Sequence, residues 1–207
     1  ADDVIEVQSE IGFVLEGVSG ADTLIGGSGD DTLIGGGGDD VFVVDGGEDV
    51  IDGGAGRDAL DFSASVAGVQ VDLSTGAFVD GEGFEDQFSS IEIVTGSTFE
   101  DTLLGGSGDD TLIGGDGSDV LVGGPDDGLP GTDADVAVFE GSKGSYEFGV
   151  DALSGSLTVT SKDTGSVDIL EGIETLSFGD GPLRVSRPSS DAAFTLTGSD
   201  GTDDVIE

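Results

Sequence analysis

The sequence predicts an all-β fold, a parallel β-roll of nonapeptide repeats with a C-terminal β-rich capping region. Three observations lead to this prediction. Glycine supplies 40 of the 207 residues, whereas a typical globular protein contains roughly 7% glycine. Glycine, aspartate and large apolar residues recur with a period of nine. Each period ends in β-formers, such as Thr-Leu-Ile at 23–25. Because a disordered acidic tract would keep this composition but not its phase, we expect an ordered solenoid.

The repeats fall into two arrays, at 17–61 and at 96–139, and an insertion at 123–135 interrupts the second. Glycine dominates positions one to four, aspartate occupies position six and a large apolar residue occupies position eight. The aspartates at position six are Asp22, Asp31, Asp40, Asp49, Asp58, Asp101, Asp110, Asp119 and, after the insertion, Asp135, with Asp133 as the competing candidate. The apolar residues at position eight are Leu24, Leu33, Phe42, Ile51, Leu60, Leu103, Leu112 and Leu121.

Each repeat is expected to form half a coil of the solenoid. The glycines permit positive φ and a tight turn. In the three-residue strand that follows, only the middle side chain points to one face, and that residue is the large apolar one. Two repeats then complete a coil, so repeats i and i+2 lie above one another. This arrangement places Asp22 over Asp40 and Asp31 over Asp49.

The stacked turns predict a cation site. Carboxylates from two coils, together with backbone carbonyls of the turns, would form an all-oxygen cage of the kind that Ca²⁺ prefers. Without a cation, the stacked carboxylates would repel one another. We expect roughly five Ca²⁺ ions, three in the first array and two or three in the second. Besides the aspartates of position six, the candidate metal-site residues are those at positions one and three: Gly26, Ser28, Gly35, Gly37, Gly53, Ala55, Gly105, Ser107, Gly114 and Asp116.

The pattern G-G-x-G-x-D-x-U-x, with U a large apolar residue, resembles the RTX (repeats-in-toxin) calcium-binding nonapeptides, also called hemolysin-type repeats. The best matches are 26–34, 35–43, 53–61, 105–113 and 114–122. The resemblance implies a parallel β-roll, type I secretion without an N-terminal signal peptide, and folding only outside the cell. Several glycine positions depart from the pattern, and we expect distorted sites there: Val18, Val44, Asp45, Ser97 and Phe99.

The remaining segments are expected to extend or to close the same stack. Residues 1–16 form an opening segment with a partial repeat, and 62–95 form longer β coils linking the arrays; the alternative for 62–95 is a separate loop domain. Residues 140–185 form a β cap over the unpaired end, although a lectin-like or partner site there is the alternative. The expected core of the cap is Phe139, Tyr146, Phe148, Leu157, Leu176 and Phe178.

The two ends of the chain share a pentapeptide. Residues 2–6 and 203–207 both read DDVIE, so we expect 186–207 to be a linker and the start of a further repeat. Neighbouring repeats of a longer chain are then expected partners.

Composition excludes several classes of function. The formal net charge is −40, so phosphate backbones and anionic membranes would repel the chain. No apolar run approaches the roughly 20 residues of a membrane helix. Histidine and cysteine are absent, which removes the commonest general base and thiolate chemistry. The carboxylates recur with every coil, whereas a catalytic pair occurs once. We therefore expect no enzyme activity in this chain.

The sequence favours a non-catalytic calcium-binding segment of a large secreted or cell-surface bacterial protein, adhesin- or toxin-like, that folds on calcium binding after export. One alternative is an accessory C-terminal module of a secreted exoenzyme such as a protease, lipase or polysaccharide epimerase. Another is an adhesin with a ligand site of its own. Thr23, Thr32, Thr102 and Thr111 recur at position seven, and a flat threonine face could bind ice, but the surface ligand is not identified by the sequence.

Overall fold

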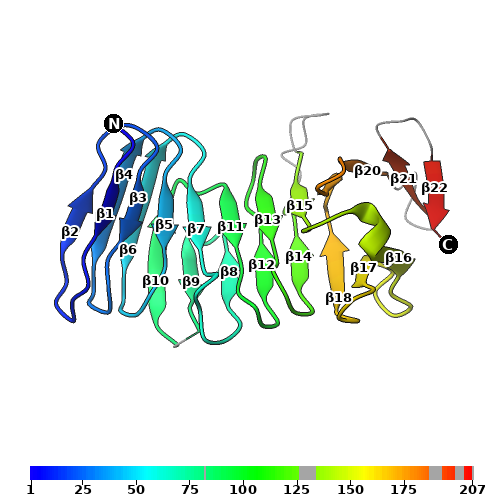
Figure 1. Cartoon of the computed structure of the whole chain (residues 1–207), viewed down its shortest axis with the longest axis horizontal. Helices are drawn as coiled ribbons and strands as arrows, with labels where there is room; N and C mark the ends of the chain where they lie inside the picture. Colours follow the sequence, from blue (N-terminus) through cyan, green and yellow to red (C-terminus); the bar gives the residue numbers. More distant parts are fainter. Residues whose placement is uncertain (82, 126–133, 187–192, 199–202, 207) are drawn as a thin grey trace.

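The computed structural model shows an elongated stack of coils in which two β-sheets face each other (Figure 1). It describes residues 1–81, 83–125, 134–186, 193–198 and 203–206. Most of the expected insertion at 123–135, including Asp133, lies outside these residues. The all-β prediction is confirmed, because the only helical element in the described chain is the short 3-10 helix η1 (Lys143–Ser145).

The chain passes back and forth between the two sheets. Across sheet A the order is β1 (Val4–Glu6), β3 (Thr23–Ile25), β5 (Val41–Val43), β7 (Ala59–Asp61), β11 (Ile93–Thr95), β13 (Thr111–Ile113), β15 (Val136–Val138), β19 (Thr175–Ser177), β20 (Leu183–Ser186), β21 (Phe194–Gly198) and β22 (Asp203–Ile206). Across sheet B it is β2 (Val14–Glu16), β4 (Thr32–Gly37), β6 (Val50–Ala55), β10 (Glu85–Ser89), β9 (Ala77–Val79), β8 (Gln70–Asp72), β12 (Thr102–Leu104), β14 (Val120–Val122), β18 (Val167–Glu171), β17 (Leu157–Ser161) and β16 (Tyr146–Val150).

The strands of the arrays pair in parallel with a register of two repeats. Leu24 of β3 lies opposite Phe42 of β5, and Leu33 of β4 lies opposite Ile51 of β6. The predicted coil of two repeats is therefore confirmed. A side chain at position six thus meets the same position of the next coil, 18 residues further along the chain.

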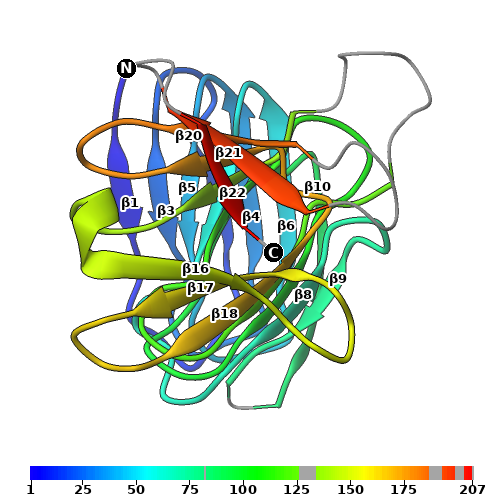
Figure 2. The same cartoon turned by 90° about the vertical axis from the view of Figure 1, so that its right-hand side faces the viewer.

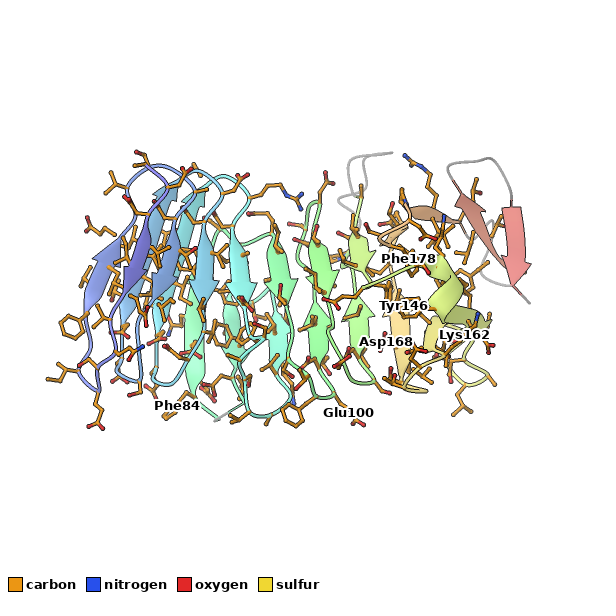
Figure 3. All side chains as sticks on the ribbon, viewed as in Figure 1. Phe84, Glu100, Tyr146, Lys162, Asp168 and Phe178 are labelled. Atoms are coloured by element: carbon orange, nitrogen blue, oxygen red, sulfur yellow. The ribbon has the colours of Figure 1, made fainter. Side chains whose placement is uncertain are left out.

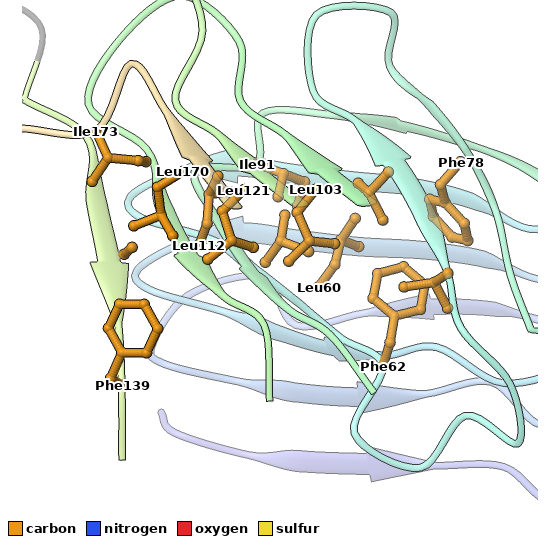
Figure 4. Close-up of a cluster of buried hydrophobic side chains, with 14 of the residues drawn as sticks. Leu60, Phe62, Phe78, Ile91, Leu103, Leu112, Leu121, Phe139, Leu170 and Ile173 are labelled. Carbon is orange, nitrogen blue, oxygen red and sulfur yellow. The ribbon is translucent and has the colours of Figure 1, made fainter. Parts of the chain in front are cut away.

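The apolar residues of position eight form the core between the sheets. All eight that the pattern identifies have 0–1% of their surface exposed. Figure 4 shows Leu60, Leu103, Leu112 and Leu121 packed beside one another in this layer. Burying one such side chain contributes about 2 kcal/mol, so the core is a row of similar small contributions.

The segment 62–95 remains in the stack but is not a set of extra parallel coils. In sheet B, β8, β9 and β10 form an antiparallel meander inserted between β12 and β6. The chain then returns to sheet A, where β11 pairs in parallel with β7 and β13. The glycine-rich turns are missing here, and an Asx turn at Asp72, which accepts the N–H of Ser74, helps to reverse the chain between β8 and β9. Three aromatic rings, Phe62, Phe78 and Phe88, fill the widened core.

Residues 1–16 carry both sheets one coil further than the repeat pattern alone. β1 pairs in parallel with β3, and β2 pairs in parallel with β4. This segment is therefore more regular than its sequence suggests.

Antiparallel strands close the opposite end of the stack. β18, β17 and β16 end sheet B, and β20 and β21 follow β19 in sheet A. Figure 2 shows these strands crossing the end of the roll. Phe139, Tyr146, Phe148 and Phe178 form one ring cluster, and Leu157 and Leu176 are buried beside them. In the described part of 186–207, β22 pairs antiparallel with β21, whereas a further coil would require parallel pairing.

Candidate metal centre

The aspartates at position six tie each coil to the one before it. Oδ1 of Asp40 accepts the backbone N–H of Asp22 at 2.8 Å, and Oδ1 of Asp49 accepts that of Asp31 at the same distance. In the same way, Oδ1 of Asp58 accepts the N–H of Asp40 at 2.8 Å. Oδ1 of Asp119 accepts the N–H of Asp101 at 2.9 Å. The structure thus brings these residues into the expected stack, but neighbouring carboxylates are joined through a backbone N–H rather than facing one another directly.

The second oxygen of many of these carboxylates is buried and unsatisfied. Oδ2 makes no hydrogen bond within the described residues in the following aspartates: Asp22, Asp31, Asp40, Asp58, Asp86 and Asp119. Leaving a buried acceptor unsatisfied costs about 1–3 kcal/mol, and more when it is charged. A row of such oxygens is therefore costly unless a proton or a cation neutralises it.

Except at Asp86, the orphaned oxygens face the glycine at position one of their own repeat. A Cβ built on Gly17 would lie 2.5 Å from Oδ2 of Asp22 and 2.8 Å from the carbonyl oxygen of Gly35 in the next coil. A Cβ on Gly35 would likewise meet Oδ2 of Asp40 and, at 2.7 Å, the carbonyl oxygen of Gly53. Only glycine fits here, and its missing side chain leaves a cradle of oxygen atoms from two coils. An all-oxygen donor set of this kind suits a hard cation such as Ca²⁺.

Carboxylates alone do not make this centre. Within the part of the chain that the structure describes, no three acidic side chains gather as a metal-binding group. A cation in the cradle would therefore need the backbone carbonyls as well as the aspartate.

Burial also raises the pKa of these carboxyl groups. Desolvation raises the pKa of Asp49, Asp86 and Asp119 to about 7, against the opposing effect of a backbone hydrogen bond. Desolvation raises the pKa of Asp58 and Asp101 as well. Since burial penalises the charged form, the charged row is costly near neutral pH without a counter-ion.

A comparison with family models identifies the repeats. The model described as RTX calcium-binding nonapeptide repeat (4 copies) matches residues 16–51, 42–64 and 95–129. These are RTX calcium-binding repeats. No curated protein matches the chain. RTX repeats form β-rolls, bind Ca²⁺ and act as non-catalytic modules of proteins that are typically secreted.

The backbone positions expected to bind the metal divide into two groups. At position one of the RTX repeats, the glycines are buried and each faces Oδ2 of its own aspartate: Gly26, Gly35, Gly53, Gly105 and Gly114. At position three, Ser28, Ala55, Ser107 and Asp116 are exposed. The carbonyls of Gly37 and Ala55 accept hydrogen bonds from Gly20 and Gly38 of the preceding coil.

Two aspartates of the second RTX array differ from the rest. Oδ2 of Asp101 accepts the N–H of Ser97, and Oδ2 of Asp110 accepts that of Gly106, both at 2.7 Å. Their second oxygens are therefore already engaged within their own repeat. Asp135 keeps the stacking bond, since its Oδ1 accepts the N–H of Asp110 at 2.9 Å.

Position five has a role that the sequence analysis missed. Oδ1 of Asp39 accepts the N–H of Arg57 in the following coil at 3.0 Å, and Oδ1 of Asp30 accepts that of Glu48. These bonds run in the opposite direction to those of position six. The doubled aspartate in Asp30-Asp31 and Asp39-Asp40 is the signal that could have revealed this second clamp.

The row of position six also continues where the glycines are lost. Oδ1 of Asp86 accepts the N–H of Asp49 at 2.6 Å, and Oδ1 of Asp168 accepts that of Asp119 at 3.0 Å. Glu92 and Glu174 do the same for Asp58 and Asp135. Each of these four acids begins a four-residue stretch of the form acid-x-apolar-x. This stretch matches positions six to nine of the repeat, but the glycine-rich turn of positions one to four does not precede it.

The departures from the RTX pattern have separate outcomes. Val18 keeps the glycine-like backbone, with φ of +75° and an exposed side chain. Asp45 accepts the N–H of Gly27 through Oδ2 at 2.8 Å. Ser97 is buried and its hydroxyl donates to Oδ1 of Asp101 at 2.9 Å. Among the five departures only Val18 has a positive φ, so backbone strain of this kind is confined to it. The expected distortion of the metal sites stays a prediction.

The four threonines of position seven do not share a face. Thr23 and Thr111 lie in sheet A, whereas Thr32 and Thr102 lie in sheet B. Successive repeats alternate between the sheets, so position seven alternates as well. The expectation of one flat threonine face for ice is therefore wrong.

Proposed function

We propose that this chain is a calcium-assembled structural module of a large secreted or cell-surface bacterial protein, adhesin- or toxin-like, and that it carries no catalytic site of its own. The observation that supports this most strongly is the row of buried Oδ2 atoms without a hydrogen-bond partner. The RTX family match supports calcium as the ion. In the described chain, no helix is long and apolar enough to cross a membrane.

The proposal assigns one Ca²⁺ to each cradle between a position-six aspartate and the position-one glycines of its own and the next coil. The aspartate contributes the charged oxygen, and the glycine of the next coil contributes its carbonyl, as Gly35 does for Asp22. The cradles at Asp22 and Asp40, where an orphaned oxygen and the carbonyl of a next-coil glycine occur together, are the strongest candidates. At Asp58 the neighbouring carbonyl is that of Ser90. Asp101 and Asp110, whose second oxygens are engaged, are expected to hold calcium more weakly.

Calcium binding would then drive folding. The net charge of −40 opposes a compact chain, and the cradles exist only in the folded state. An ion that binds only the folded state stabilises it by mass action. Extracellular modules bind Ca²⁺ at about 10⁻⁴–10⁻³ M, so the chain would remain extended at cytosolic calcium levels, which suits type I secretion, and would fold outside.

A matched pair of variants tests the assignment. Asp40→Asn keeps Oδ1 as the acceptor for the N–H of Asp22 but replaces the orphaned oxygen with an amide. Asp39→Asn makes the same change in the exposed aspartate of position five, which accepts the N–H of Arg57. Calorimetric titration should show fewer calcium ions bound to Asp40→Asn and an unchanged number bound to Asp39→Asn. Circular dichroism should show that the wild-type chain gains its β signal with calcium. Equal stoichiometry in the two variants would overturn the ligand assignment, and a chain already folded in chelator would overturn calcium-driven folding.

A further inference from the structure

A cavity of about 260 Å³, which we call the junction cavity, lies where the antiparallel cap meets the edge of the coils. One wall is formed by the last residues of three sheet A strands, Thr95, Ile113 and Val138, and by the turns that follow them. The other wall is formed by the cap and includes Tyr146 of β16 and Asp168 of β18. Neither the coils nor the cap could form this cavity alone.

The lining of the junction cavity is acidic and contains no balancing cation. Asp116 and Glu140 are exposed, whereas Asp168 has only 9% of its surface exposed. No lysine or arginine of the described chain lines the cavity, and the nearby Lys162 donates instead to the carbonyl oxygen of Gly144 at 2.9 Å. The other polar side chains of the lining carry hydroxyl groups, which can accept hydrogen bonds: Ser63, Thr95, Ser97, Thr98, Tyr146, Ser161, Thr164 and Ser166.

Asp168 places a buried negative charge in this cavity. Its Oδ1 accepts the N–H of Asp119 at 3.0 Å, and within the described residues this is the one hydrogen bond of the carboxylate. The second oxygen of Asp168 therefore has no partner in that part of the chain, although the side chain lines the cavity. Since an unsatisfied buried acceptor is costly, above all when it is charged, a cationic donor would be favoured here.

Aromatic rings lie beside the acids. Phe139 and Tyr146 both line the cavity, with ring centroids 5.5 Å apart in an edge-to-face arrangement. The phenol of Tyr146 donates to the carbonyl oxygen of Glu140 at 2.6 Å, which holds the ring in place. Burial raises the pKa of Tyr146, and the charges of Asp168, Glu140 and Asp116 raise it further, so all three acids act on this ring. Figure 3 shows Tyr146 and Asp168 near each other at the cap end of the roll.

The junction cavity continues into a more open groove, which we call the coil groove. Phe99, with 45% of its surface exposed, and Glu100 line this groove on the side of the coils. Figure 3 shows Glu100 on the coil side of Asp168. The cavity and the groove share four lining residues: Thr98, Asp116, Thr164 and Ser166. An enclosed cavity joined to an open groove suits an extended ligand that inserts one group and lays the rest along the surface.

The spacing of the acids also favours a ligand larger than an ion. The described ranges contain no group of three acidic side chains close enough to hold a metal ion, so a ligand that contacts Asp116, Glu140 and Asp168 together must span the distances between them. A guanidinium group is planar and permanently charged, carries five N–H donors and stacks on aromatic rings. These properties match a cavity lined by carboxylates, hydroxyl groups and two aromatic rings.

We propose that the junction cavity binds the arginine side chain of a basic peptide segment of a partner protein, and that the coil groove holds the neighbouring part of that peptide. The guanidinium donates to the free oxygen of Asp168 and stacks on Tyr146, while Asp116 and Glu140 add negative charge at the rim. The net charge of −40 attracts such a segment from a distance. This inference goes beyond the proposed function, because it gives the junction of coils and cap a binding role in addition to a structural one.

The single tyrosine provides a signal at the proposed site. The chain contains one tyrosine and no tryptophan, so tyrosine fluorescence reports the surroundings of Tyr146. The probes are three peptides, acetyl-Gly-Gly-X-Gly-Gly-amide, in which X is arginine, lysine or citrulline; citrulline has nearly the shape of arginine but no charge. In saturating calcium, the arginine peptide should change the tyrosine emission and bind with a Kd below about 1 mM by calorimetry. The citrulline peptide should bind at least about tenfold more weakly, because it lacks charge-assisted hydrogen bonds. The lysine peptide should also bind more weakly than the arginine peptide, because an ammonium group cannot form the same planar, bidentate contact.

Three variants locate the binding. Asp168→Asn keeps Oδ1 as the acceptor for the N–H of Asp119 but removes the charge, and it should weaken binding of the arginine peptide by about tenfold. Glu140→Gln changes an exposed side chain of the rim, away from the stack of coils, and should weaken binding by about threefold. Glu147→Gln is the matched control, since it removes an exposed acid of β16 that lines neither the cavity nor the groove. It should leave the affinity unchanged.

The outcomes separate this inference from the proposed function. No binding at about 1 mM peptide, or equal affinities for the arginine and citrulline peptides, in a chain that folds with calcium would overturn the inference and leave the proposed function intact. Wild-type affinity in both Asp168→Asn and Glu140→Gln would also overturn it, and a lysine peptide that binds as tightly as the arginine peptide would overturn the choice of arginine. Arginine-dependent binding by a chain already folded in chelator would support the inference while overturning calcium-driven folding.

Discussion

Oδ1 of Asp40 accepts the backbone N–H of Asp22 in the preceding coil at 2.8 Å. The adjacent Asp39 accepts the N–H of Arg57 in the following coil at 3.0 Å. Two consecutive aspartates thus bind one coil to both of its neighbours. The bonds use Oδ1 in each case, which leaves Oδ2 of Asp40 buried and without a hydrogen bond in the described residues. The proposed function thus divides two roles between the oxygens of one carboxylate: Oδ1 joins the coils and Oδ2 is assigned to the ion.

The raised pKa values predict how the calcium-free chain responds to pH. Burial raises the pKa of Asp49, Asp86 and Asp119 from 3.8 to about 7. The folded state then holds protons more tightly than the unfolded state. The stability of the calcium-free fold is therefore greatest below the unfolded pKa of 3.8, and it is lost as pH rises through the folded pKa of about 7. Calcium-stripped protein should show more β signal by circular dichroism at about pH 5 than at about pH 8. Unfolding of the stripped protein on acidification would contradict this prediction.

Calcium should reverse that dependence. The ion binds the deprotonated carboxylates, so protons compete with it below about pH 7. The calcium midpoint for folding should therefore rise as pH falls from about 8 to about 6. A midpoint that does not change across this range would show that these aspartates do not bind the ion.

The cradle at position one should be intolerant of a single methyl group. Gly35→Ala places a Cβ against Oδ2 of Asp40 and the carbonyl oxygen of Gly53. Crowding of this kind costs about 1–3 kcal/mol, and it fills the space assigned to the ion. The calcium midpoint measured by circular dichroism should rise, and the number of ions bound should fall.

Gly37→Ala is the matched control, because it adds the same methyl group two residues further along the same turn. Its Cβ would meet only the carbonyl oxygen of Ala55, at 3.9 Å. The wild-type chain already has alanine at this position in the repeat that begins at Gly53. Gly37→Ala should therefore keep the wild-type calcium midpoint or lower it slightly. Equal effects of the two substitutions would argue against the cradle.

A strained residue offers a way to stabilise the roll. Val18 has φ of +75°, a left-handed conformation that costs a β-branched residue about 1–3 kcal/mol. Val18→Gly removes this strain at a smaller cost in backbone entropy. The melting temperature in saturating calcium should rise, with a net gain of about 1 kcal/mol. Val66→Gly, at an equally exposed valine without positive φ, should lower it instead.

Sequence periodicity is sufficient to predict the regular part of this fold. A strand of three with one inward side chain requires two repeats per coil, and the pairing of Leu24 with Phe42 confirms it. The same periodicity does not reveal Asp86 and Asp168, which join the row without a glycine turn before them. Nor does it reveal the meander of 62–95, because the reversal near Asp72 depends on a local side-chain hydrogen bond. Which oxygen of Asp40 is engaged depends on three-dimensional contacts between coils.

Substitutions in the core of the roll should destabilise the fold even in saturating calcium. Leu112 is fully buried in β13, between Val94 of β11 and Ala137 of β15. Leu112→Ala should cost about 2–5 kcal/mol, measured by denaturant unfolding in saturating calcium. Leu112→Asp places a charge in the same position and should abolish folding even in excess calcium, because the ion binds at the turns and cannot compensate a buried charge between the sheets. Leu153→Asp, at a side chain that is 98% exposed, should fold normally. A folded Leu112→Asp variant would show that position eight does not form the core.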